Sequence, residues 1–166
     1  MSNKSGDALE CNKAKKSLIV NYIAFEVIAA VLYVFIYVFL NKHYAGKLMN
    51  TNDIGKITIE ANILIVFVSI VLNVLVVIFT NLLTFSNKKV KKEDVKSLFV
   101  TTIIIQLVFA VLSIIGPICE FALANNITKE LINMSVTVLG IALGGEIIKR
   151  IICLVAQKVM LSKNVE

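Results

Sequence analysis

Four long blocks of apolar residues, separated by short polar segments, dominate the chain. A hydrocarbon core of about 30 Å needs about 20 helical residues at 1.5 Å rise each, and every block reaches that length. Because a backbone in lipid must satisfy its hydrogen bonds within each segment, the blocks are expected to be helices. The predicted transmembrane helices cover about residues 17–40, 59–85, 97–120 and 130–161.

The composition agrees with a membrane protein built as one domain over residues 1–166. Hydrophobic residues make up 58% of the chain and the mean hydropathy is +0.86, which is more apolar surface than a soluble domain of this size can bury. The connections are short, so helices adjacent in sequence are expected to be antiparallel. The predicted fold is all-α: an antiparallel four-helix transmembrane bundle with up-down-up-down order, preceded by a basic tail at 1–16.

The distribution of basic residues predicts the orientation of the chain. Most of the 17 Lys and Arg residues lie in the amino-terminal tail, the second connection and the carboxy-terminal part. The positive-inside rule therefore predicts a multi-pass cell-membrane protein with both termini in the cytoplasm. The net charge of +6 needs no nucleic acid partner to explain it, because basic loops beside a membrane bind anionic lipid head groups. The residues expected to make this contact are Lys88, Lys89, Lys91 and Lys92.

Each apolar block carries one stripe of polar or small side chains, which are costly in lipid and are expected to face the bundle interior. Counting 1.5 Å per residue from the inner interface places Glu26, Asn73 and Gln106 within about 4 Å of one level. We expect these three side chains to form a hydrogen-bonded cluster near the bilayer midplane, completed by Thr137 from the fourth helix. The opposite face of the first helix is expected to contact lipid through Val20, Val27, Val31, Val34 and Val38.

The fourth block has two further features. Gly140 and Gly144 have the G-x-x-x-G spacing that lets another helix approach closely. Glu146, Lys149 and Arg150 follow, and a span that begins near residue 131 brings these charges to the inner interface after about 18 residues. The alternative is a span that begins later, which would bury Lys149 and Arg150 near the midplane as an anion-binding or gating site.

Catalytic and metal-binding chemistry is not expected. The connections are too short for a soluble domain, and the sequence has no phosphate-binding glycine loop and no Ser-His-Asp arrangement. His43 has no cysteine or second histidine near it in sequence, so no metal site and no cofactor are predicted. The three cysteines do not suggest a disulfide framework.

Three functions fit this pattern. The first is a non-enzymatic membrane subunit that assembles with itself or a membrane partner as a channel, a pore or the anchor of a complex. The second is a small proton- or cation-coupled secondary transporter in which Glu26 is the coupling residue. The third is a membrane component of a toxin, immunity or phage-defence system. Glu26 itself has two interpretations: a protonated carboxyl that ties helices together, or a group that binds or relays a proton or cation.

Overall fold

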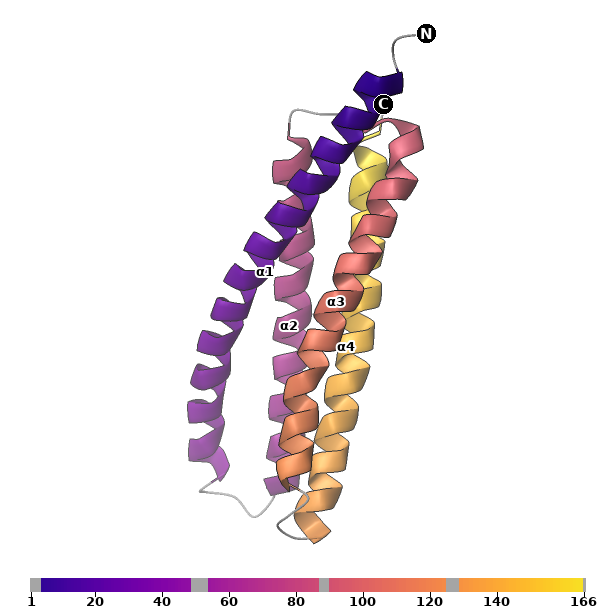
Figure 1. Cartoon of the computed structure of the whole chain (residues 1–166). Coiled ribbons are helices and arrows are strands. Elements are labelled where there is room, and N and C mark those ends of the chain that lie inside the picture. Colours follow the sequence, from indigo (N-terminus) through magenta and orange to yellow (C-terminus); the bar gives the residue numbers. More distant parts are fainter. Residues whose placement is uncertain (1–3, 49–53, 87–89, 125–128, 166) are drawn as a thin grey trace.

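The computed structural model describes residues 4–48, 54–86, 90–124 and 129–165, and nearly all of them are helical (Figure 1). Consecutive helices run in opposite directions, and both termini lie at one end of the molecule, called here the terminal end (Figure 1). The other end is called the loop end. The helices are α1 Lys4–Leu48, α2 Ile54–Phe85, α3 Lys92–Ala124 and α4 Lys129–Lys163.

The helices extend beyond the apolar blocks of the sequence. Helix α1 begins at Lys4, so most of the segment 1–16, which we expected as a tail, is its first turns. These turns contain Lys, Ala and Glu, which favour helix, and no proline. The apolar pattern therefore indicates where lipid can surround a helix, and the helix itself continues into polar sequence.

Three of the four helices are long and apolar enough to cross a membrane, over Glu10–Tyr44, Gly55–Phe85 and Lys92–Cys119. Their outward faces are strongly apolar. The valines expected to contact lipid from α1 are all exposed; for example, Val27 is 58% exposed. These helices are those of an integral membrane protein. Helix α4 is equally long, but Glu146, Lys149 and Arg150 lie within it.

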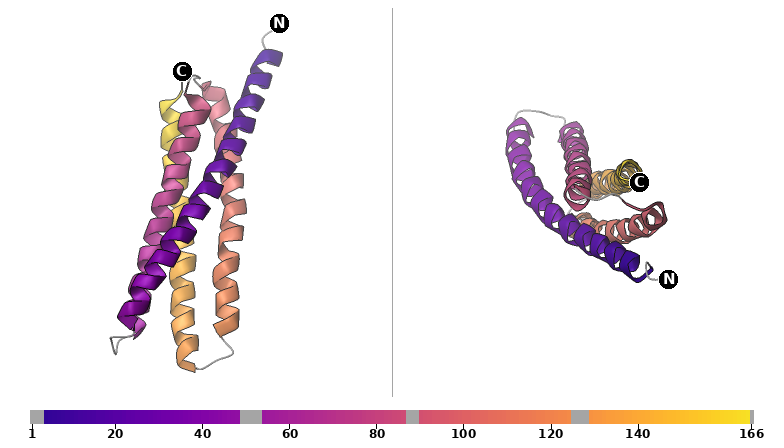
Figure 2. Two further views of the ribbon diagram at one scale, coloured as in Figure 1. Left: turned by 90° about the vertical axis from the view of Figure 1, so that its left-hand side faces the viewer. Right: turned by 90° about the horizontal axis from the view of Figure 1, so that it is seen from above.

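The helices form a four-membered ring in which α1 and α4 are diagonal partners. Helix α1 packs against α2 and α3, and α4 packs against the same two helices. Helix α1 crosses the other three at an angle and separates from α3 and α4 toward the loop end (Figures 1 and 2). The interior is therefore packed differently at the two ends.

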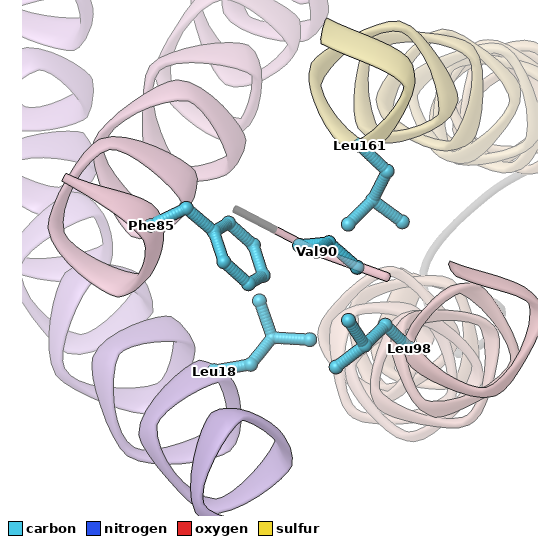
Figure 3. Packing of buried hydrophobic residues seen from close by; sticks show 5 residues of the cluster. All are labelled: Leu18, Phe85, Val90, Leu98 and Leu161. Atoms are coloured by element: carbon cyan, nitrogen blue, oxygen red, sulfur yellow. The ribbon is translucent and has the colours of Figure 1, made fainter. Parts of the chain in front are cut away.

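A cluster of buried apolar side chains closes the terminal end (Figure 3). All four helices and the α2–α3 connection contribute to it. The backbone N–H of Val90 in this connection donates to the carbonyl oxygen of Asn164 at 2.7 Å, which ties the connection to the end of the chain. The cluster, called here the terminal core, consists of Leu18, Phe85, Val90, Leu98 and Leu161.

The close approach of two helices that we predicted for Gly140 and Gly144 occurs one residue later. A Cβ atom at Gly140 or Gly144 would have no neighbour within 4 Å, so neither glycine makes a close contact within the chain. A Cβ at Gly145 would lie 2.8 Å from Cγ2 of Val66 and still closer to its Cγ1. Gly145 is therefore the residue that lets α4 pack against α2.

Replacing Gly145 by alanine is expected to destabilise the protein, because Val66 must move to accommodate the new methyl group. The expected loss is about 1–3 kcal/mol, measured as a lower thermal unfolding temperature in detergent. Gly144→Ala is the matched control and should be neutral or stabilising, because its Cβ enters open space. Adding Val66→Ala should restore the stability of the Gly145 variant; equal stability of the two single variants would contradict the packing at Gly145.

Candidate functional site

Four charged side chains meet in the middle of the bundle. Glu146 lies between Lys149 and Arg150: its Oε2 pairs with the Lys149 ammonium, and its Oε1 lies 2.6 Å from Nη2 of Arg150. Nη1 of Arg150 lies 3.7 Å from Oε1 of Glu26 on the diagonal helix α1. These side chains are at most 11% exposed. The two carboxylates and the two cations balance each other, and we call the group the charged cluster.

Uncharged polar side chains from α1, α2 and α3 complete the coordination of the two cations. Nη1 of Arg150 donates to the Gln106 side-chain carbonyl at 2.7 Å. Lys149 donates to the Ser69 hydroxyl at 3.3 Å. The Gln106 amide in turn donates to the hydroxyl of Tyr22. All four helices therefore hold the cluster in place, and α1 and α4 contact each other through it across the bundle.

We expected the charges of α4 at the inner membrane interface, and the structure buries them within the bundle. Arg150 contacts Glu26 and Gln106, and it lies about three helical turns from Leu161 of the terminal core. Our expectation counted each charge as a separate insertion penalty. Inside the bundle each charge has an opposite charge and hydrogen bonds, which offset the cost of burial. The alternative of a buried Lys149 and Arg150 is closer to the structure.

The structure brings only part of the predicted polar cluster together, and Arg150 lies at its centre. Glu26 and Gln106 both contact Arg150 rather than each other. Asn73 is buried, and its amide donates to the backbone carbonyl of Ser69 one turn earlier in α2. Thr137 is exposed and precedes Arg150 by more than three turns of α4, so it lies outside the charged cluster.

A cavity of about 690 Å³ adjoins the charged cluster on the side of the loop end. It lies between α1, where this helix leaves the bundle, and the other three helices. Most of its wall is apolar, with Tyr33 and Tyr37 on α1. Among the described lining residues, the one nearest the terminal end is Glu26 on α1 and Lys149 on α4. The cavity therefore ends at the charged cluster.

Two buried oxygen atoms at the inner end of the cavity have no hydrogen-bond donor. They are Oε1 of Glu26 and Oδ1 of Asn73, two residues that are 9% and 7% exposed. Both residues line the cavity. Buried polar groups in native proteins are nearly always paired, and an unpaired acceptor costs about 1–3 kcal/mol. Oε1 of Glu26 has the Arg150 guanidinium at 3.7 Å but accepts no hydrogen bond, and Oδ1 of Asn73 also lacks a donor, so the inner end of the cavity presents two acceptors without hydrogen bonds.

On the other side of the charged cluster, polar pairs continue the interior toward the terminal end. Asn81 and Gln157 exchange two amide hydrogen bonds of 2.7 and 3.1 Å. One turn further, the Asn21 amide donates to the Thr84 hydroxyl at 3.1 Å. The terminal core follows. A column of polar side chains therefore runs from the charged cluster to an apolar seal.

The remaining predicted contacts lie elsewhere in the chain. Lys91 and Lys92 are exposed at the terminal end, whereas Lys88 and Lys89 fall outside the described residues. No group of three His, Cys, Asp or Glu side chains that could hold a metal occurs in the ranges that the structure describes.

Comparison with known proteins gives no match: no family model, no curated protein and no solved structure is similar to this chain.

Proposed function

We propose that this chain is a small secondary transporter of the cell membrane, with Glu26 as the coupling residue. The observation that carries the proposal is a cavity that ends inside the bundle at a buried carboxyl group, one oxygen of which accepts no hydrogen bond. In the proposed arrangement all four helices cross the bilayer and both termini are cytoplasmic. Exposed Lys91 and Lys92 at the terminal end fit this orientation, because they can contact anionic head groups there. The cavity then faces the outside.

The shape of the interior supports a transporter better than a pore or an anchor. A pore needs a continuous path, and here the terminal core occupies the bundle axis on one side of the charged cluster. An anchor has no use for a cavity of about 690 Å³ beside buried charges. Alternating access needs a central site that is closed at one end at a time, which is the arrangement on either side of Glu26.

The position of Glu26 suggests how binding and movement are coupled. Helices α1 and α4 are diagonal, and the Glu26–Arg150 ion pair joins them across the interior. A proton on Glu26 would cancel its charge and leave Arg150 paired with Glu146 alone. Because α1 already separates from the bundle toward the loop end, loss of this pair is expected to change the angle at which it packs. A single four-helix bundle also has little interior room for a substrate and its gates, which favours a dimer as the transporting unit.

Glu26→Gln is expected to abolish coupled proton movement while the protein remains folded, because Gln keeps the size of the side chain and Arg150 keeps its closer pair with Glu146. The purified protein is placed in liposomes that contain a pH-sensitive dye, and proton flux is followed after a gradient of Na⁺, of K⁺ or of a neutral amide such as benzamide is imposed. Loss of an essential intramembrane carboxyl should reduce the flux to the level of empty liposomes. Size-exclusion chromatography checks folding, and Glu10→Gln, an exposed position on the same helix, is the matched control.

Two results would overturn the proposal. One is flux that survives Glu26→Gln, which would indicate a path that does not use this carboxyl. The other is flux that is absent from the wild type under every gradient while the variant loses its fold, which would assign Glu26 to helix packing alone.

A further inference from the structure

We infer that the cavity binds an uncharged amphipathic molecule whose N–H or O–H donors pair with Glu26 and Asn73. This inference names the substrate class of the proposed transporter and rests on that function only for the movement of the ligand. Binding itself follows from the geometry of the cavity.

The two oxygens that accept no hydrogen bond define the polar end of the ligand. Oε1 of Glu26 and Oδ1 of Asn73 belong to different helices, α1 and α2, and both line the inner end of the cavity. Both atoms only accept hydrogen bonds, so the group that satisfies them must donate. A primary amide or a pair of hydroxyls supplies two donors at once.

The balance of charge around the cavity favours an uncharged ligand. Glu26, Glu146 and Lys149 line the cavity, and Arg150 lies 3.7 Å from Glu26, so the two carboxylates are already balanced by two cations. A cation at Glu26 would add an unbalanced positive charge beside Arg150 and Lys149 in a medium of low dielectric constant, where such repulsion is strong. An anion would meet Oε1 of Glu26 and Oδ1 of Asn73, which only accept hydrogen bonds. A neutral donor leaves the charged cluster balanced and still completes its hydrogen bonds.

The wall of the cavity defines the rest of the ligand. Side chains such as Val66, Leu139 and Leu143 present apolar surface, and Tyr33 adds an aromatic ring. The volume of about 690 Å³ lies within the range of about 300–1,000 Å³ that is usual for small-molecule sites. The expected ligand therefore has an apolar or aromatic body with a polar group at one end.

Three probes of nearly the same shape test the charge preference: benzamide, benzamidinium and benzoate. The full chain in lipid nanodiscs is titrated with each probe by saturation-transfer NMR, and empty nanodiscs give the background. Benzamide is expected to bind saturably and at least about tenfold more tightly than the two ions, the effect of about 1.4 kcal/mol. Tighter binding of benzamidinium or benzoate, or no saturable benzamide binding above background, would overturn the inference.

Two variants locate the site. Asn73→Leu removes one acceptor with little change in volume and should weaken benzamide binding about tenfold. Ala30→Phe narrows the cavity from α1 and should abolish binding, whereas Val27→Phe on the lipid-facing side of the same helix should leave it unchanged. Unchanged affinity in both cavity variants would also overturn the inference. Specific binding without any coupled flux would sustain this inference and count against the proposed transport.

Discussion

Replacing Arg150 by methionine is expected to remove the folded protein almost completely. The guanidinium group is paired with Glu146, lies near Glu26 and donates hydrogen bonds to Gln106 and Ser113. Without it, two buried carboxylates would share Lys149 as the only cation of the charged cluster. Removing one partner of a buried ion pair costs about 3–5 kcal/mol, a large part of the 5–15 kcal/mol that stabilises a typical protein. The yield of monodisperse protein in detergent and its unfolding temperature measure the loss.

The double variant Glu146→Met and Arg150→Met separates charge balance from the loss of side-chain volume. It removes one anion and one cation, so Glu26 and Lys149 remain balanced, and much of the lost stability should return. Lys158→Met, an exposed position two turns further along α4, should have no effect. A stable Arg150→Met protein would mean that water reaches these charges freely, and the interpretation of a closed charged cluster would then be wrong.

The course of α1 was largely predictable from its sequence, because lipid imposes a strong periodicity on a helix. The face with Val27 and Val31 is exposed, and the face with Tyr22 and Glu26 is buried. The rise per residue also placed Glu26 and Gln106 at one level, and Arg150 contacts both of them. These inferences needed only the solvent and the geometry of one helix at a time.

The position of α4 was not predictable in the same way. A single sequence assigns a cost to each of Glu146, Lys149 and Arg150, whereas their actual cost depends on partners from other helices, such as Glu26 and Gln106. The spacing of Glu146 and Arg150, one turn apart, was the only signal of pairing, and it does not show the depth at which the pair lies.

The cavity was equally hidden from sequence analysis. It exists because α1 leaves the bundle toward the loop end, and the direction of a helix axis depends on packing contacts along its whole length. The Gly145–Val66 contact shows the difficulty. The sequence does not say which of Gly140, Gly144 and Gly145 faces α2, and only the rotation of α4 against α2 brings Gly145 against Val66. That one oxygen of Glu26 and one of Asn73 accept no hydrogen bond likewise becomes apparent only when all neighbours are in place.

Weakening the terminal core is expected to open the interior to water from the terminal end. The reporter is Cys153, which is fully buried between Arg150 and Gln157 on α4 and is inaccessible to reagents in the closed bundle. Leu98→Ala with Leu161→Ala removes two side chains of the terminal core, at about 2–5 kcal/mol each if the space does not collapse. If even part of this lost stability lowers the free energy needed to open the terminal end, the modification rate of Cys153 should rise at least about tenfold.

A charged, membrane-impermeant thiosulfonate reagent measures that rate in a protein whose other cysteines, Cys11 and Cys119, are replaced by serine. The control removes two lipid-facing leucines, Leu82→Ala with Leu83→Ala, which are 52% and 60% exposed and are not members of the terminal core. If transport uses the polar column, the benzamide probe should slow the reaction in the open variant, because it stabilises the arrangement in which Glu26 and Asn73 face the cavity. Equal rates in the two double variants would show that the terminal core is not the seal, and alternating access would then need another closing point on this side of the charged cluster.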